Sequence, residues 1–135
     1  MTLKIMGFQD FDSILVTDIM SKALITVNPA TTCFQIAKMM ERGFIGAVLV
    51  SEKNNPVGII TDRDFAIKIA TNRLSYDTPA REIMSSPLIT VNYDSSVLEA
   101  VKTMSIKKIR KIAVSKDNKI IGIVTSTDVV NHLTR

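Results

Sequence analysis

Short apolar runs alternate along the chain with turns and with segments of helical spacing, and the whole order occurs twice. A shift of 64 places lays residues 18–71 over residues 82–135 without a gap, and 18 of these 54 positions are identical. Ordinary composition would give roughly three identities by chance. "DIMSKALITVN" lies over "EIMSSPLITVN", and "GIITDRD" lies over "GIVTSTD". The chain therefore contains an internal duplication, and each copy should fold in the same way.

Each copy predicts the same series of elements. The run "LITV" (Leu24–Val27 and Leu88–Val91) is typical of a short strand rich in β-branched residues. Apolar residues then recur at i, i+3, i+4 and i+7, which predicts a helix with one buried face: Cys33, Ile36, Ala37 and Met40, matched by Val97, Ala100, Val101 and Met104. Two apolar runs around a polar turn predict adjacent strands, "IGAVLV" with "VGIIT" and "IAV" with "IIGIVT". A closing helix carries Phe65, Ile67 and Ile69 in one copy and Val129, Val130 and Leu133 in the other.

The predicted organisation is two β-α-β-β-α units of the α/β (α+β) class. A unit of roughly 55 residues is marginal for an independent core, so we expect two units to pack into one compact module with pseudo-twofold symmetry. The predicted boundaries are an N-terminal arm at 1–15, a first repeat at 16–72, a linker at 73–79 and a second repeat at 80–135. Pro79 is well placed to open the next helix.

Composition narrows the class of protein. Apolar residues make up 46% and charged residues 22% of the chain, as in soluble globular proteins. No apolar stretch approaches the roughly 18–20 residues that cross a bilayer, and the N-terminus lacks the features of a secretory signal. The single cysteine, Cys33, excludes an intramolecular disulfide and fits a reducing compartment. These features predict a cytoplasmic protein without membrane association.

The segments Thr61-x-x-Asp64 and Thr125-x-x-Asp128 support two interpretations. Thr followed three residues later by an acidic residue is typical of a helix capping box. The box favours Glu or Gln at its last position, however, and both copies have Asp directly after a glycine-led strand, where ligands tend to bind. A carboxylate can accept both hydroxyl protons of a ribose, and a helix N-terminus suits a phosphate. The two interpretations are compatible, because Thr can cap while Asp faces outward.

One order of segments occurs twice: "DIM", "LITV", a helix and a Gly-h-h-Thr-x-x-Asp turn, where h is any apolar residue. This doubled order resembles a pair of CBS domains, the modules named after cystathionine β-synthase. The resemblance covers about 110 of the 135 residues. It implies a three-stranded sheet flanked by helices in each repeat, and two clefts between the repeats. Such clefts bind AMP, ADP or ATP, or sometimes S-adenosylmethionine or NAD, and the pairs often form flat homodimers.

The resemblance also implies two sets of ligand-binding residues. The first cleft would use one Thr-x-x-Asp turn for ribose and phosphate, two apolar residues for the base and two cations for phosphates: Thr61, Arg63, Asp64, Leu88, Ile89, Arg110 and Lys111. The second cleft would use the equivalent positions: Thr125, Thr127, Asp128, Leu24, Ile25, Gly46 and Ala47. Because Gly46 and Ala47 are uncharged and Thr127 replaces Arg63, we expect weaker phosphate binding in the second cleft.

Net charge leaves a rival hypothesis open. The chain carries a formal charge of +4 and a basic cluster at 107–111 (Lys107, Lys108, Arg110 and Lys111), which is compatible with nucleotides or with nucleic acid. Such a cluster is more often a solvated face. Aromatic residues for base stacking are scarce at 5%, and no nucleic-acid recognition motif occurs, so nucleic-acid binding is disfavoured.

Catalysis is disfavoured more strongly. No P-loop, Ser-His-Asp set or metal-ligand spacing occurs, and His132 has no second histidine near it in sequence. The sequence therefore predicts no catalytic residue, no metal site and no catalytic cofactor. Cys33 on an apolar helical face is expected to be a buried small hydrophobe rather than a nucleophile.

The predicted function is a regulatory module that binds an adenine nucleotide and senses the energy state of the cell. Ligand would shift the population between two arrangements of the repeats, and the signal would pass to a separate effector protein or through homodimer geometry. The alternative is a basic nucleic-acid-binding or protein-interaction scaffold without a small-molecule ligand.

Overall fold

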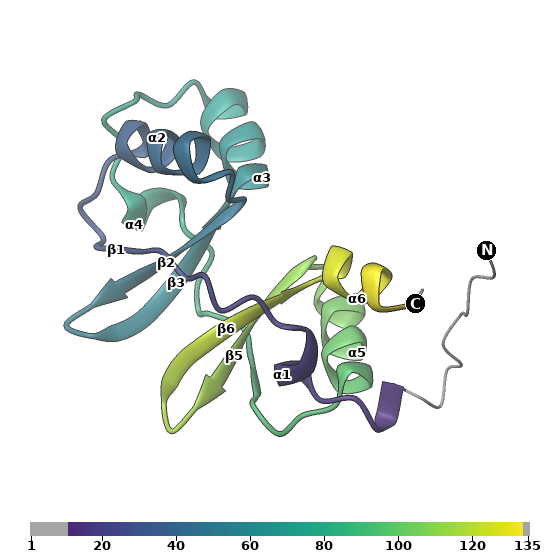
Figure 1. The fold of residues 1–135 in the computed structure, drawn as a ribbon. Coiled ribbons are helices and arrows are strands. Elements are labelled where there is room, and N and C mark those ends of the chain that lie inside the picture. The colour runs from purple at the N-terminus through teal and green to yellow at the C-terminus, as the bar shows by residue number, and fades with distance from the viewer. Residues whose placement is uncertain (1–10, 134–135) are drawn as a thin grey trace. The chain divides into compact units, whose positions relative to one another are not determined.

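The computed structural model describes residues 11–133, and these residues form two compact units. Unit 1 contains residues 11–23 and 89–133, and unit 2 contains residues 24–88. Each unit is a three-stranded sheet with helices, as Figure 1 shows, which confirms the predicted fold class. The segment that precedes the first strand of each sequence repeat folds into the unit of the other repeat. The repeat in sequence and the unit in space are therefore offset.

Unit 2 has its strands in the order β1-β2-β3. Its elements are β1 (Thr26–Val27), α2 (Cys33–Gly43), β2 (Ala47–Glu52), β3 (Asn55–Thr61), α3 (Asp62–Asp64), the π-helix η2 (Phe65–Ala70) and α4 (Ala80–Ile83). β1 runs parallel to β2, and β2 runs antiparallel to β3. Lys53 and Asn54 have φ angles of 51° and 66°, so the hairpin turns through two left-handed residues, the geometry that matches strand twist.

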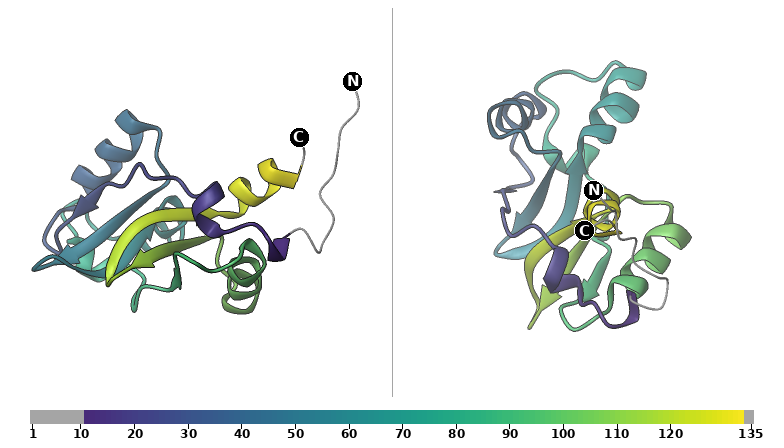
Figure 2. Two further views of the ribbon diagram at one scale, coloured as in Figure 1. Left: turned by 60° about the horizontal axis from the view of Figure 1, so that its bottom comes forward. Right: turned by 45° about the vertical axis from the view of Figure 1, so that its right-hand side comes forward.

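Unit 1 repeats this plan with the order β4-β5-β6. Its elements are α1 (Val16–Ile19), β4 (Thr90–Asn92), α5 (Val97–Lys107), β5 (Lys111–Lys116), β6 (Lys119–Thr125) and α6 (Ser126–Leu133). Asp117 and Asn118 make the equivalent left-handed hairpin turn. In Figure 2, from two further directions, α1 lies beside β6 and α6.

The structure differs from the prediction in where two strands start and in how many apolar helix residues are buried. The "LITV" strands begin two residues late, because ladder pairing starts only at Thr26 and Thr90. The apolar helical faces are narrower than predicted, since Ala37 on α2 is exposed. In the closing helices Ile67 is 52% exposed and Val130 is 60% exposed. Apolar spacing locates a helix, but it does not fix how wide a stripe the neighbouring sheet can cover.

Each unit has its own apolar core. In unit 2, Cys33 and Ile36 of α2 pack with the strand residues Val48, Val50 and Ile60. In unit 1, α5 packs on β5 and β6 through Val97, Ala100, Met104, Ile112, Val114 and Val124. The short helices complete the cores, because Ile83 of α4 joins the first and Val16 of α1 joins the second, both with no exposed surface.

The glycine that leads each Thr-x-x-Asp motif has a structural explanation. Beside Gly58, Ile59 exchanges backbone hydrogen bonds of 2.9 and 3.1 Å with Ser85, and beside Gly122, Ile123 does the same with Ser21 at 2.8 and 3.0 Å. A Cβ on Gly58 would lie 2.8 Å from the Ser85 carbonyl oxygen, and one on Gly122 would lie 3.0 Å from that of Ser21. The chain that leaves each short helix therefore lies too close to the strand for a side chain.

The predicted linker at 73–79 is part of unit 2. The carbonyl oxygens of Tyr76 and Thr78 accept from the amides of Phe34 and Cys33 at 3.0 and 2.9 Å, so the linker satisfies the first amides of α2. In unit 1, Ile14 does the same for Val97 at 2.7 Å. Residues 1–10 of the predicted N-terminal arm lie outside the described residues. Among residues 11–133 no helix is both long and apolar enough to cross a membrane.

Candidate ligand-binding site

Unit 2 gathers several predicted ligand-binding residues at one end of its sheet. Ala47, which opens β2, pairs with Thr61, which ends β3, and the parallel pairing of Thr26 with Leu49 places the approach to β1 at the same end. The Ile25 carbonyl accepts from the Leu49 amide at 2.9 Å. This sheet end of unit 2 therefore holds Leu24, Ile25, Gly46, Ala47, Thr61, Arg63 and Asp64.

Unit 1 has an equivalent sheet end. Lys111 pairs with Thr125, and Thr90 pairs with Ala113, so the start of β5, the end of β6 and the approach to β4 lie together. The sheet end of unit 1 therefore holds Ile89, Arg110, Lys111, Thr125, Thr127 and Asp128. The two predicted sets each draw on both units, since the first takes Leu88 and its Thr-x-x-Asp turn from unit 2 but Ile89, Arg110 and Lys111 from unit 1.

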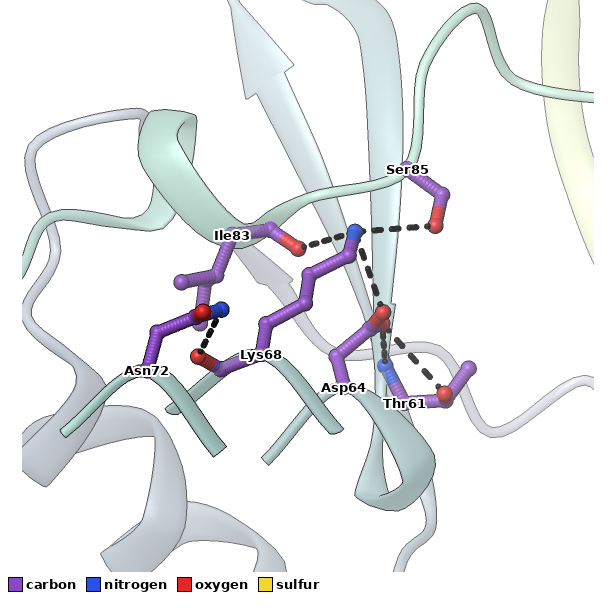
Figure 3. A network of polar contacts seen from close by, with 6 residues as sticks. All are labelled: Thr61, Asp64, Lys68, Asn72, Ile83 and Ser85. Atoms are coloured by element: carbon purple, nitrogen blue, oxygen red, sulfur yellow. Dashed lines mark hydrogen bonds and ion pairs between the residues drawn. The ribbon is translucent and has the colours of Figure 1, made fainter. Parts of the chain in front are cut away.

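Asp64 is the buried charged residue of the described chain, at 8% exposed. Its Oδ2 accepts from the Thr61 amide at 2.8 Å and from the Thr61 hydroxyl at 3.3 Å. Its Oδ1 lies 3.2 Å from the Nζ of Lys68, one helical turn later (Figure 3). A buried carboxylate is costly unless it is paired and hydrogen-bonded, and these contacts supply both conditions.

Asp128 in unit 1 accepts the same bond from the amide of its threonine. Its Oδ2 accepts from the Thr125 amide at 2.8 Å, and its own amide donates to the Thr125 hydroxyl at 3.1 Å. The position equivalent to Lys68 is His132 on α6. The two turns therefore share the bond from the threonine amide to the carboxylate. The threonine hydroxyl donates to the carboxylate in unit 2, whereas it accepts from the aspartate amide in unit 1. The residue four places after the aspartate differs as well.

Both aspartates are helix caps, and part of the argument against capping is wrong. A capping box favours Glu or Gln at its last position, yet both aspartate carboxylates make the reciprocal bond at 2.8 Å. Asp18 makes the same bond to the Leu15 amide at 2.9 Å, in a box without a preceding glycine-led strand. Asp at this position is therefore no signal for a ligand by itself.

The helix N-termini do not offer their first amides to a phosphate. The Asp62 amide donates to the Gly46 carbonyl at 3.1 Å, and the Ser126 amide donates to the Arg110 carbonyl at 2.8 Å. These bonds anchor each helix to the start of the neighbouring strand. The first amide of each helix is therefore used within the fold, and among the side chains at these ends Arg63 and Arg110 are exposed.

Lys68 is the residue that sequence reasoning missed. Its Nζ donates to the Ile83 carbonyl at 2.8 Å and to the Ser85 hydroxyl at 3.4 Å, in addition to the ion pair with Asp64 (Figure 3). The signal in the sequence was the i, i+4 spacing of Asp64 and Lys68, which is favourable for an ion pair on a helix. The contact with the Ile83–Ser85 segment had no signal, because it depends on the tertiary fold.

Two further predicted side chains have structural roles. Cys33 is 2% exposed, and its burial raises the pKa of the thiol above its ordinary value of 9.0, against a smaller opposing backbone hydrogen bond. The predicted burial of Cys33 is therefore confirmed. In the basic cluster, Lys107 lies in the last turn of α5 and Lys108 is its left-handed C-cap, where cations are stabilised by the helix dipole.

Comparison with known proteins identifies the class to which this fold belongs. The model of the CBS domain family matches residues 16–71 and 80–135. A Methanopyrus kandleri protein, MK0525, is 45% identical over 121 residues, which cover 87% of this chain and 62% of that protein. The chain thus spans about three fifths of the length of this relative.

Solved structures agree with the family match. A Pyrococcus horikoshii protein superposes with a TM-score of 0.85 at 28% identity, over 90% of this chain and 92% of that one. The CBS domain pair of protein MJ0100, in complex with 5′-methylthioadenosine and S-adenosyl-L-methionine, superposes with a TM-score of 0.79 at 31% identity, over 87% and 98%. The chain belongs to the CBS domain family and carries two CBS domains, as the sequence resemblance predicted. CBS pairs are typically regulatory modules without catalytic activity.

Proposed function

We propose that this protein is a non-catalytic sensor that binds an adenosine-containing small molecule through its Thr-x-x-Asp turns. The observation that carries the proposal is the similarity, at 31% identity over 87% of the chain, to a CBS pair bound to two adenosine derivatives. The duplicated turn supplies the matching chemistry, because each copy holds an aspartate carboxylate at a sheet end, where a ribose hydroxyl can donate to it. AMP, ADP and ATP are the preferred ligands, with S-adenosylmethionine and NAD as further members of the class.

The two ligand-binding sets are proposed as the sequence predicted them. Thr61, Arg63 and Asp64 act with Leu88, Ile89, Arg110 and Lys111, and Thr125, Thr127 and Asp128 act with Leu24, Ile25, Gly46 and Ala47. The first set contains three cations and the second contains none. A phosphate-bearing ligand should therefore prefer the first set, because each phosphate contact with Arg or Lys is a charge-assisted hydrogen bond.

The signal is proposed to pass to a separate effector protein or through a homodimer of this chain. A ligand can shift an equilibrium only by its difference in affinity for the two states, so ligand must favour one arrangement of the chain over another. The proposed location is the cytoplasm, in keeping with a single buried cysteine and a nucleotide ligand.

Isothermal titration with AMP, ADP, ATP, NAD and S-adenosylmethionine tests this function. We expect saturable binding by the wild-type chain and a loss of at least about tenfold in affinity for Asp64→Ala, since a hydrogen bond to a charged group is removed. Asp18→Ala is the matched control, because Asp18 makes the same cap contact outside the Thr-x-x-Asp motif. Its affinity should equal that of the wild type.

Two results would contradict the proposal. The first is that none of the five compounds binds to a folded wild-type chain, which would leave Asp64 and Asp128 as caps and favour a protein-interaction scaffold. The second is an equal loss of affinity for Asp64→Ala and Asp18→Ala, which would attribute the effect to lost helix capping.

A further inference from the structure

We infer that Lys68 is a positioning residue of the ligand site, which orients the Asp64 carboxylate so that it accepts one ribose hydroxyl rather than two. The inference rests on the proposed function and specifies how its first set of residues selects the sugar. It depends on three features of unit 2: the contacts of Lys68, the acceptor positions of Asp64 and the different residue at the equivalent position of unit 1.

Lys68 is fixed in place by its own contacts. An ammonium group has three donors, and Lys68 directs them to Asp64, to the Ile83 carbonyl and to the Ser85 hydroxyl. Its backbone is held as well, because its carbonyl accepts from the Asn72 side-chain amide at 2.8 Å, as Figure 3 shows. The side chain of Lys68 is 36% exposed, whereas that of Asp64 is 10% exposed. A cation held in this way occupies one acceptor position on Oδ1 of the carboxylate beside it.

The contacts of Asp64 leave little acceptor capacity for a ligand. An ionised carboxylate has about four acceptor positions, two on each oxygen. The Thr61 amide and hydroxyl take two positions on Oδ2, and Lys68 takes one on Oδ1. The remaining position, on Oδ1, can accept one hydroxyl. A second hydroxyl must displace the Thr61 hydroxyl, whose contact at 3.3 Å is the longest of the three.

The helix that carries Lys68 also differs between the units. It is a π-helix over Phe65–Ala70 in unit 2, whereas α6 in unit 1 is an α-helix over Ser126–Leu133. π-helical turns are rare and occur frequently at functional sites. In unit 1 the residue four places after the aspartate is His132, and an imidazole has at most two donors in place of three. Lys68 therefore has no lysine counterpart in unit 1.

The test compares ligands that lack one hydroxyl at a time. AMP and 5′-methylthioadenosine are titrated into the wild-type chain, followed by the 2′-deoxy and 3′-deoxy forms of whichever binds. We expect one deoxy form to lose about tenfold in affinity, as for one hydrogen bond to a charged group, and the other to lose less than about threefold. In Lys68→Met the two deoxy forms should become equal within about threefold, because Oδ1 then has two open acceptor positions and can accept both hydroxyls.

Two further variants separate positioning from support of the fold. Lys38→Met removes an exposed ion pair with Glu41 in the same unit and should keep the wild-type preference between deoxy forms. Lys68→Arg keeps the cation and should restore most of the preference if the methionine variant is poorly folded. Thermal unfolding of each variant checks the fold.

The outcomes distinguish this inference from the function on which it rests. Wild-type binding with an unchanged preference in folded Lys68→Met overturns the role of Lys68 and leaves the proposed function in place. A uniform loss of affinity for all three ligands also overturns the inference, because it assigns a structural role to Lys68. Absence of binding by every compound overturns both.

Discussion

The two Thr-x-x-Asp turns arose from one duplicated sequence, yet they have diverged beside the aspartate. In unit 2, Asp64 is 8% exposed and is held by Thr61 and by Lys68. In unit 1, Asp128 keeps the bond from the Thr125 amide, and His132 stands where unit 2 has Lys68. The cations are distributed differently as well, because the sheet end of unit 1 holds Arg110 and Lys111 where unit 2 has Gly46 and Ala47.

This comparison separates residues that the fold requires in both units from residues that differ between the units. The glycine, the threonine and the aspartate recur because each has a structural role: close approach of a neighbouring segment, and capping of a helix. The residues beside them differ between the two copies. Differences at these neighbouring positions are therefore the better guide to different roles of the two turns.

The largest expected effect concerns the two cores. The equivalent helical positions Ile36 and Ala100 are both fully buried but differ in volume. Ile36→Ala should lower the free energy of unfolding by about 2–5 kcal/mol, because it leaves a cavity that unit 2 cannot close. Urea denaturation measures this change. Met39→Ala on the same helix, 37% exposed, should cost less than about 1 kcal/mol, and an equal cost for both would show that α2 contributes no packed core.

The next effect concerns the glycines of the motif. Gly58→Ala and Gly122→Ala should each destabilise the protein by about 1–3 kcal/mol. The new methyl group at Gly58 would overlap the Ser85 carbonyl oxygen, and that at Gly122 would overlap the Met20 side chain and press on the Ser21 carbonyl oxygen at 3.0 Å. Gly43→Ala is the control, because its Cβ would come no closer than 3.6 Å to Ile45. That substitution should be neutral or slightly stabilising within a helix, by up to about 1 kcal/mol. Equal stability of all three variants, measured by thermal unfolding, would disprove the close approach.

A smaller effect distinguishes the two lysine ion pairs of unit 2. Lys68→Met should cost about 1 kcal/mol in the free energy of unfolding, because it removes a contact with a buried carboxylate and a hydrogen bond to the Ile83 carbonyl. Lys38→Met should cost only a few tenths of a kcal/mol, since both partners of that pair are exposed. If chemical denaturation gives the two variants the same stability, the network around Lys68 has no energetic weight.

The smallest effect is a pH dependence of the free energy of unfolding, which Cys33 of unit 2 should cause. Burial raises the pKa of Cys33 above 9.0, so the neutral thiol is favoured in the folded chain. The stability from this shift is complete below pH 9.0 and is lost as pH rises through the folded pKa, because the unfolded chain ionises first. Cys33→Val introduces the residue of the other copy, Val97, and removes the effect.

Urea midpoints of the wild type and Cys33→Val, compared at about pH 8 and about pH 10, provide the measurement. The wild type should lose stability relative to the variant at the higher pH. A constant difference would show that the thiol is as accessible to water in the folded chain as in the unfolded chain.

Much of the fold was predictable from the sequence, because the duplication lets each element be recognised twice. The hairpins at Lys53-Asn54 and Asp117-Asn118 and the helices that begin at Cys33 and Val97 follow from apolar spacing and turn residues. The offset between repeat and unit was not predictable. Helices α1 and α4 are only four residues each. Their packing in the core of one unit or the other depends on tertiary contacts, which leave no pattern in the sequence.

The candidate site was predictable only in part. Thr61 and Asp64 were singled out by their recurrence, and the structure shows how they contact each other. The role of Lys68 was missed, because its partners Ile83 and Ser85 lie 15 and 17 residues away in sequence. Long-range contacts of this kind leave no periodic pattern in a single sequence.

The most direct test follows the backbone amides of Thr61 and Leu15 during a titration with the tightest-binding adenosine ligand. Both amides donate to an aspartate cap, at 2.8 and 2.9 Å, but only the first belongs to a Thr-x-x-Asp motif. If Asp64 is both a helix cap and the acceptor of a ribose hydroxyl, the Thr61 resonance shifts with the affinity measured by calorimetry, and the Leu15 resonance stays in place. Saturable binding that leaves the Thr61 resonance unmoved would contradict the account.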